Sequence, residues 1–589
     1  MANESFANTL VVEVDGKPLP ADVKPLLTYA YVDDSRNLPD MFVLRFRDPG
    51  HVVLAKAGFK IGAAASLKVQ TADPGGPKPL MSGEVTAVGV ELDAHGTFTE
   101  VRGYDQAHRL FRGKRVAVYP NMTIADVVRK VVQRAGIALG KVDAVPGFGG
   151  RPDTQLSQDN LSDWEFLSRL ARIVGAQIAV RDGKLDFTLP KPPASAPRAG
   201  AKAKANPLVL ELHSSLVALR AGITTAGQVP EVQVRGWDFE SKQEVVATAT
   251  PTTAGTEVAQ ADPAALANKF GAPPHLEAGL AYRTQGEVKA AAEALAAQLG
   301  GACAELTGVA RGNPELKAGT AVALTNVGEP FQGKYTLTST RHLFAEHTGY
   351  TTEFTVSGKQ ERSLYGLVHS AKDKPLNGLV PAIVTNAKDP LKLGRVQVQF
   401  PWLSKELTST WARTVQMGAG ANRGTVVLPE VGDEVLVGFE HGDFDAPYVL
   451  GGLHNGKDKP PRLGKPAVDE ASGEIAARGF VSRKGHRVEL VEDEGILISS
   501  GDGKFLVRLD QKTQTIEITS GKSIAVKARN GITVDAGAGP LELKGQKVSV
   551  QAQTDLTAEG TLVKIAARGQ GEVSATGPLT VKGAVVRIN

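Results

Sequence analysis

The chain has 589 residues, of which 42% are hydrophobic and 22% are charged, as in soluble globular proteins. This length predicts several domains, because single hydrophobic cores stop growing at roughly 250–300 residues. Lys plus Arg number 67 and Asp plus Glu number 63, so the net charge of +4 is too small to indicate a nucleic-acid partner. Cys303 is the only cysteine, which excludes an intramolecular disulfide and favours a reducing compartment.

Neither a signal peptide nor a transmembrane helix is expected. The first ten residues lack a basic region followed by an apolar run. No stretch approaches about 18 uninterrupted apolar residues, the length that a membrane-spanning helix needs. We therefore expect the protein to be cytoplasmic at synthesis.

The first part of the chain predicts strands. Between residue 8 and about residue 115, short apolar runs alternate with Gly and Asp-Pro turn signals. The clearest strands are predicted at 9–14, 41–46, 66–69 and 83–88.

Two helices are predicted next. Thr123 is a candidate N-cap for a helix that ends near residue 134. Ser162 and Glu165 have the spacing of a capping box, and Gly175 follows where a C-terminal glycine is expected.

Two low-complexity segments separate the following modules. Residues 190–207 are rich in Pro, Ala and Lys, which predicts an exposed linker or long loop. Residues 360–377 form a second polar connector. Between them we predict a strand at 231–235, an alanine-rich helix at 285–299 and further strands up to residue 358.

Residues 378–456 predict a small β-barrel of the OB type. Five short apolar runs separated by Gly, Asp and Pro fit the strands of such a barrel. They lie at 382–384, 394–400, 410–415, 434–439 and 448–450.

The last 75 residues repeat a pair of apolar residues about every eight residues. Alternation within each pair is the signature of a strand with one buried face, and glycines lie between the pairs. Eight residues cannot enclose a core alone, so we predict a rod of β-strands whose core is shared by several chains. A β-meander packed on the rest of the protein is the alternative. The predicted core residues are Ile516, Ile518, Ile524, Val526, Ile532, Val534, Leu541, Leu543, Val548 and Val550.

These motifs together resemble the VgrG family of spike proteins, which includes the tail spikes of contractile phages. Residues 428–440 (LPEVGDEVLVGFE) resemble the family's OB module, residues 160–167 (NLSDWEFL) and 234–238 (VRGWD) its hub, and the repeat its spike. Residues 10–16 and 37–46 are more similar to spikes of phage-tail-like contractile injection systems. A type VI secretion VgrG remains the alternative.

The resemblance implies a multidomain, mainly β fold with some α+β structure. We expect a hub with β-barrel elements over residues 1–370, the OB-fold at 378–456, a linker at 457–478, and an intertwined triple-stranded β-helix at 479–589 in a homotrimer. Such a spike plugs the inner tube and pierces the target envelope when the sheath contracts. Its implied partners are two further copies, inner-tube and baseplate proteins and, transiently, the target membrane, with effectors left open. Its implied location is an injection particle, with release or ejection from the producing cell left open.

No catalytic residue, cofactor or metal site is predicted. A Gly-x-Ser-x-Gly elbow is missing, and residues 457–478 are too few to fold as an inserted enzyme. A peptidoglycan hydrolase is one alternative, and a free saccharide- or nucleic-acid-binding OB protein is another. The second needs a basic groove with aromatic platforms, whereas core packing accounts better for Phe400, Trp402, Trp411 and Tyr448. Core packing is likewise the better account of Trp164 and Phe166. For Arg341 and His342, a structural role is favoured over a catalytic one.

The end of the chain predicts a blunt tip. After His486 there is no histidine or cysteine, so the rod has no imidazole or thiolate with which to close its point around a metal. Val585, Val586 and Ile588 would then form an exposed apolar strand edge. The family resemblance implies that a separate PAAR-repeat tip protein binds these three residues.

Overall fold

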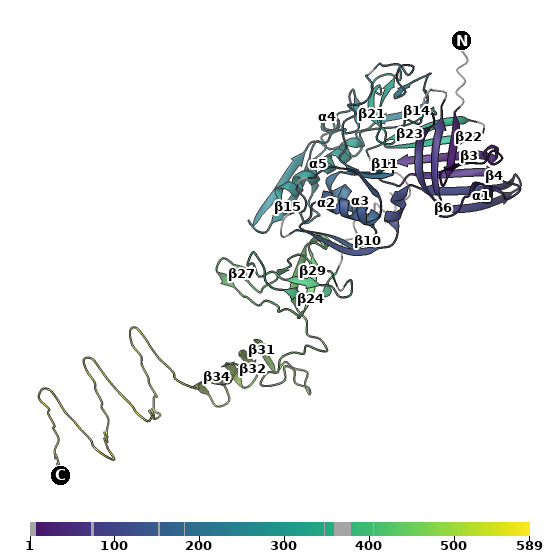
Figure 1. Ribbon diagram of the computed structural model, residues 1–589. Helices are drawn as coiled ribbons and strands as arrows, with labels where there is room; N and C mark the ends of the chain where they lie inside the picture. Colours follow the sequence, from purple (N-terminus) through teal and green to yellow (C-terminus); the bar gives the residue numbers. More distant parts are fainter. Residues whose placement is uncertain are drawn as a thin grey trace. The chain divides into compact units, whose positions relative to one another are not determined.

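The computed structural model describes residues 8–71, 76–145, 147–150, 154–181, 183–198, 200–346, 348–358, 378–404 and 406–588. The chain divides into two compact units, Met1–Lys459 and Pro460–Asn589 (Figure 1). The predicted connector at 360–377 lies outside the described residues. Within the described part, no helix is long and apolar enough to cross a membrane.

The first unit is built around an 11-stranded sheet with the order β14-β19-β23-β22-β3-β4-β7-β6-β5-β1-β2. β3 pairs antiparallel with β22, so segments about 300 residues apart in sequence share one sheet. Phe42, Leu44 and Phe46 from β4 are fully buried in its core. The strands are β1 Thr9–Val14, β2 Lys17–Pro18, β3 Leu27–Ser35, β4 Met41–Arg47, β5 Ala64–Gln70, β6 Lys78–Asp93, β7 Gly96–Tyr104, β14 Leu216–Ile223, β19 Ala304–Arg311, β22 Ser339–Ala345 and β23 Gly349–Val356. The predicted strands at 9–14, 41–46, 66–69 and 83–88 are confirmed.

Both predicted helices are present as α2 Ile124–Arg134 and α3 Asp163–Val174. Ser162 and Glu165 form the predicted capping box, and Gly175 ends α3 at φ +68°. Trp164 and Phe166 are buried in the core, as predicted. Around these helices lie β8 Arg115–Pro120 paired with β10 Gln155–Leu161, and a three-stranded sheet of β11 Gln177–Arg181, β12 Lys184–Thr188 and β9 Ala138–Val142.

The rest of this unit consists of a helix packed on a small sheet, together with several short elements. The predicted alanine-rich helix is α5 Gln285–Gly301, which packs on the sheet β16-β15-β18. A Cβ added at Gly175 would lie 2.9 Å from Ala294 Cβ, so the glycine also allows α3 and α5 to approach closely. The remaining elements are α1 Val53–Ala57, α4 Pro263–Asn268, β13 Val209–Glu211, β15 Val232–Asp238, β16 Gln243–Ala249, β17 Thr256–Val258, β18 His275–Glu277, β20 Ala321–Thr325 and β21 Gly333–Thr336.

The OB barrel has the sheet order β25-β24-β29-β30-β26. It closes through the bridge Val396↔Ala412, whose two backbone hydrogen bonds measure 2.9 and 2.7 Å. The predicted strands at 394–400 and 410–415 are shorter than expected, because only a few residues of each find ladder partners. Trp402 corrects the core interpretation, since it is 52% exposed and its Nε1 donates to the Pro381 carbonyl at 3.0 Å. The strands are β24 Val380–Asn386, β25 Gln397–Gln399, β26 Arg413–Thr414, β29 Glu434–Phe439 and β30 Pro447–Gly452, with a small hairpin of β27 Ala419–Gly420 and β28 Arg423–Gly424.

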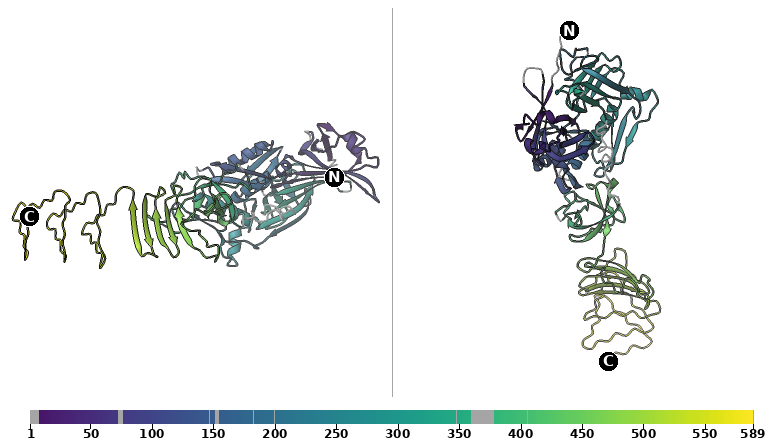
Figure 2. Two further views of the ribbon diagram at one scale, coloured as in Figure 1. Left: turned by 90° about the horizontal axis from the view of Figure 1, so that it is seen from below. Right: turned by 90° about the vertical axis from the view of Figure 1, so that its right-hand side faces the viewer.

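The second unit begins as an antiparallel meander in which each strand pairs with the next in sequence (Figure 2). Its strands are β31 Ala477–Val481, β32 Arg487–Val491, β33 Gly495–Ser499, β34 Phe505–Asp510 and β35 Thr515–Ser520. The described residues 521–588 contain no strand, although the repeat predicted strands there. The prediction of strands over residues 521–588 is therefore wrong for the single chain, where these segments lack ladder hydrogen bonds.

Candidate functional surfaces

Two neighbouring strands of the first unit form a ribbon with two different faces. β8 and β10 pair antiparallel, with Ser157 opposite Val118 and Asp159 opposite Val116. Because directly opposed residues share a face, these four side chains lie on one side and the alternate residues on the other. The ribbon can therefore bind the hub core on one face and the OB barrel on the other.

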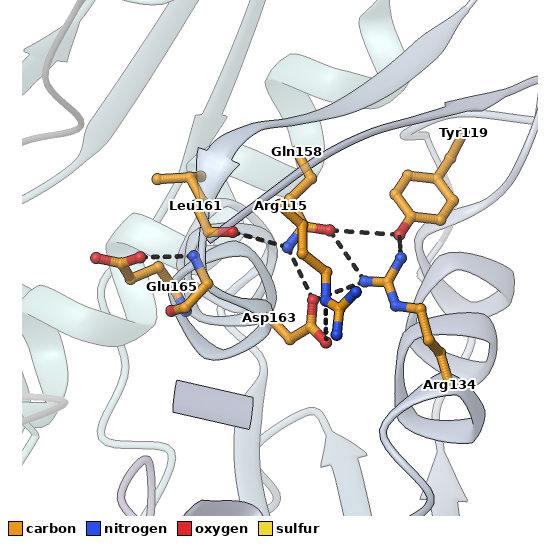
Figure 3. Close-up of polar contacts among 8 residues, drawn as sticks. Arg115, Tyr119, Arg134, Gln158, Leu161, Asp163 and Glu165 are labelled. Atoms are coloured by element: carbon orange, nitrogen blue, oxygen red, sulfur yellow. Dashed lines mark hydrogen bonds and ion pairs between the residues drawn. The ribbon is translucent and has the colours of Figure 1, made fainter. Parts of the chain in front are cut away.

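The hub face of the ribbon carries a polar network at the start of α3 (Figure 3). Asp163, with 6% of its side chain exposed, accepts from Arg134 Nη2 at 2.6 Å and from Gln158 Nε2 at 2.8 Å. Arg134 Nη1 also donates to the Tyr119 hydroxyl at 3.0 Å. Arg115 approaches the second Asp163 oxygen at 3.6 Å. Each partner stems from a different element, so this carboxylate joins α2, α3, β8 and β10.

The other face of the ribbon holds the OB barrel. Val116 and Val118 pack against the OB core, which includes Phe439 and Phe444. Beside them, the Ser157 backbone N–H donates to Asp445 Oδ2 at 2.9 Å, and the Ser157 hydroxyl contacts Asp445 Oδ1. Apolar packing and a carboxylate thus join the two domains at adjacent points.

A stack of cations and rings extends this junction. The Arg413 guanidinium lies 5.2 Å from the Phe239 ring centre and 5.4 Å from that of Tyr448. Arg283 lies 5.5 Å from the same Phe239 ring. Since Phe239 belongs to the hub and Arg413 to the OB barrel, cation–π attraction adds to the docking.

In the second unit, one face of the meander carries two ladders of apolar side chains. One ladder runs through directly paired residues Phe480, Val488, Ile498, Val507 and Ile518, and the other through Leu490, Ile496, Leu509 and Ile516. Residues two apart along a strand share a face, so both ladders lie on the same side of the sheet. Phe480 is 60% exposed and Ile516 is 72% exposed, so the single chain leaves this face open.

The opposite face is polar and partly covered. Glu489, Leu497, Arg508 and Glu517 stand opposite one another along it. Glu489 is buried, accepting from Arg487 Nη1 at 3.0 Å and from the Gly464 backbone N–H at 2.8 Å. The covered face of this sheet is therefore the polar one.

The single chain does not bring the predicted rod residues together into a core. The ten predicted core residues have exposed fractions between 54% and 72%. They are Ile516, Ile518, Ile524, Val526, Ile532, Val534, Leu541, Leu543, Val548 and Val550. The predicted tip residues are also exposed, with Val585 at 74%, Val586 at 50% and Ile588 at 91%.

The hub sheet also lines a cavity of about 880 Å³. Arg341 lies in its wall, where its Nε and Nη2 donate to the two Asp33 oxygens at 2.6 and 2.8 Å. His342, on the opposite side of β22, is 1% exposed, and burial lowers its pKa to about 3. Among the described residues, no group of three His, Cys, Asp or Glu side chains is placed to hold a metal ion.

Sequence reasoning missed the hub–OB contact residues. Val116, Val118 and Ser157 carry no motif, and Asp445 lies in an ordinary Asp-rich turn. The alternation of residues 115–120 predicts two faces, but which domain each face meets is decided by contacts almost 300 residues apart.

Comparison with known proteins agrees with this architecture. The model of the type VI secretion system/phage-baseplate injector OB domain matches residues 380–454. A second model, the Alg8 N-terminal domain, matches residues 74–346.

Individual relatives match over a short region. The type VI secretion system spike protein VgrG2a of Pseudomonas aeruginosa is 40% identical over 72 residues, which are 12% of this chain and 9% of that protein. The actin cross-linking toxin VgrG1 of Vibrio cholerae is 38% identical over 72 residues, 12% of this chain and 7% of that protein. This chain thus spans less than a tenth of the length of either relative.

The fold match is much longer than the sequence match. A chain in the lidded structure of the Francisella PdpA-VgrG complex matches with a TM-score of 0.50 and 9% identity, over 88% of this chain and 81% of that one. This chain is therefore similar to VgrG spike proteins in the sequence of its injector OB domain, and to a chain of the PdpA-VgrG complex in its fold.

Proposed function

We propose that this protein is the non-enzymatic, trimeric central spike of a contractile injection system. In this role the hub, with domain limits near 1–370, plugs the inner tube and contacts baseplate proteins. The OB-fold at 378–456 and the linker at 457–478 connect it to a triple-stranded β-helix at 479–589. The rod then pierces the target envelope when the sheath contracts.

The open apolar face of the second unit carries this proposal. Two ladders of large side chains and the repeat beyond them are exposed in one chain, while the polar face is partly covered. Burying one Ile or Leu side chain contributes about 1.5–3 kcal/mol, so leaving the whole face in water is strongly unfavourable. Two further copies of the same chain supply matching faces in the same register, which supports a three-chain rod whose core contains the ten predicted residues.

The family relationship supports a spike rather than an enzyme. Relatives are named as spike proteins, and one is named as a toxin, so an added activity occurs within such proteins. Residues 10–16 and 37–46 favour a phage-tail-like particle, with a type VI secretion VgrG as the second candidate. Effectors are further candidate partners in either machine.

The oligomeric state tests the proposal directly. We expect light scattering on the purified full-length chain to give three times the chain mass of 61.9 kDa. A variant ending at Pro466 lacks the meander and the repeat, so it should lose the trimer while its hub and OB barrel stay folded. A stable full-length monomer would contradict the proposal.

The tip is the second testable part. Residues 583–589 alternate apolar residues without a proline, and Val585, Val586 and Ile588 would form a three-fold apolar platform for a PAAR-repeat protein. Deleting residues 583–589 should abolish binding of that protein in a pull-down and leave the mass of the trimer unchanged. An assembled particle whose rod ends bare would disprove the capping role.

A further inference from the structure

We propose that the hub–OB junction is a proton-dependent latch, which docks most tightly when Asp445 is protonated and loosens when this carboxylate ionises. The inference concerns contacts within the first unit and does not depend on the oligomeric state. In this proposal, the pH controls how tightly the hub holds the OB barrel.

The latch residue lies between two elements of the OB barrel and meets the hub at one residue. Asp445 precedes β30, and both of its carboxylate oxygens face Ser157 of β10. The Ser157 N–H only donates, whereas its hydroxyl can donate or accept. In the structure both Ser157 groups donate to Asp445, and a protonated Asp445 keeps both contacts if the second is reversed, with its own O–H donating to the Ser157 hydroxyl.

The cations near this carboxylate are committed to other groups. Arg169 from α3 donates to Asp159 at 2.9 Å and to the Ser157 carbonyl. Arg283, ahead of α5, stacks on Phe239. Among the described residues, no ion pair joins Asp445 or Asp443 to a cation within 4 Å. Ionisation of Asp445 would thus place in the junction a charge that Arg169 offsets only in part, without a direct ion pair.

The remaining charged groups at the junction reinforce this effect. Asp443 lies two residues before Asp445, and its Oδ1 accepts from the Asp445 backbone N–H at 3.0 Å. Asp159 faces the same space from β10, while Glu440 accepts from Tyr448 at 3.0 Å and His441 is exposed. Like charges outnumber free cations here, so proton uptake is the available way to neutralise the site.

The acid–base properties agree with this geometry. Burial raises the pKa of Asp445 to about 7, with repulsion by Asp443 as the next cause. Burial also raises the pKa of Asp443. A detached, hydrated aspartate has a pKa of about 3.9. The docked form therefore binds the proton more tightly, and docking weakens as the pH rises from about 4 to about 7, after which it levels off.

The consequence is that the strength of the hub–OB junction depends on the pH. The Asp163 network on the other face of the ribbon contains none of these groups, so it keeps β8 and β10 fixed to the hub. A pH change would then alter how firmly the OB barrel is held without altering the ribbon that holds it.

Hydrogen–deuterium exchange on the full-length protein tests the latch. The probes are the Ser157 amide and the amides of residues 440–446, with rates corrected for the intrinsic effect of pH. In the wild type we expect the open population to rise at least about tenfold between pH 5.5 and pH 8. Asp445→Asn imitates the protonated acid, so its open population should change much less over this range, with Asp443 as the remaining titrating group.

Two further variants make the outcome decisive. Asp458→Asn replaces an exposed aspartate just after the OB barrel, still within the first unit, and should keep the wild-type pH response. Asp443→Asn removes the repelling neighbour and should move the midpoint of opening to lower pH. The latch is refuted if wild-type opening does not change with pH, or if Asp445→Asn keeps the wild-type response. Should Asp445→Asn fail to fold, an unmoved midpoint in Asp443→Asn refutes it instead.

Discussion

The two units of this protein bury their apolar residues in different ways. All five apolar clusters of the described structure lie in the first unit, where sheets curve over helices and over one another. In the second unit, Ala477 and Glu489 are the only buried residues among those described. Both units are rich in strands, so strand content alone does not produce a core. A single-layer sheet needs a second layer, and the second unit does not supply one from its own chain.

The two units also differ in the polar groups that they bury. The first unit encloses Asp163 among Arg134, Gln158 and Arg115, and uses it to join four elements. The second unit encloses Glu489 on the face opposite its apolar ladders. Polar burial therefore completes an existing core in the first unit, whereas in the second it leaves the apolar face of the single chain exposed.

The largest expected effect is a charge in the shared core. Replacing Ile524 with Asp would place three carboxylates at one level of the rod axis, at a cost of several kcal/mol per trimer. We expect light scattering to show loss of the trimer, together with a lower melting temperature of the second unit. Ser523→Asp is the matched control, because in the proposed rod the side chain next to Ile524 along the strand would point to the opposite face, and the trimer should persist. If both variants kept the trimer, or both lost it, the prediction that the second unit buries Ile524 between chains would be wrong.

A smaller effect is expected inside the first unit. Asp163→Ala leaves Arg134 without its carboxylate partner, and we expect the free energy of unfolding of the hub to fall by about 3 kcal/mol. Asp163→Asn retains an acceptor for Gln158 and should lose less. Urea denaturation measures both variants, and the mass of the full-length protein should stay unchanged. A change in mass would mean that the hub network also supports assembly.

The smallest effect is the response of the hub to acid. His342 has a pKa lowered to about 3 by burial, against about 6.5 when hydrated. Its contribution to stability is therefore present above pH 6.5 and is lost as the pH falls, by about 1.4 kcal/mol at pH 5.5. Urea denaturation of wild type and His342→Gln at pH 7.5 and 5.5 measures this, and the loss should be smaller in the variant.

Local signals in the sequence determined much of the fold. The caps at Thr123 and Ser162, the left-handed glycine at 175 and the period-2 strands each depend on neighbours within a few residues, and all are present. The motif at 428–440 likewise indicated the OB barrel and the family before any contact was known. The eight-residue repeat indicated an apolar face, although its burial by other chains stays a prediction.

Only the tertiary structure decided which faces meet. The pairing of β3 with β22, the exposure of Trp402 and the approach of Asp445 to Ser157 join residues that are far apart in sequence. The alternation of 115–120 defines two faces but does not distinguish the hub core from the OB barrel as the partner of either. Periodicity records which side of a strand is apolar, whereas the identity of the opposing surface depends on how the whole chain closes.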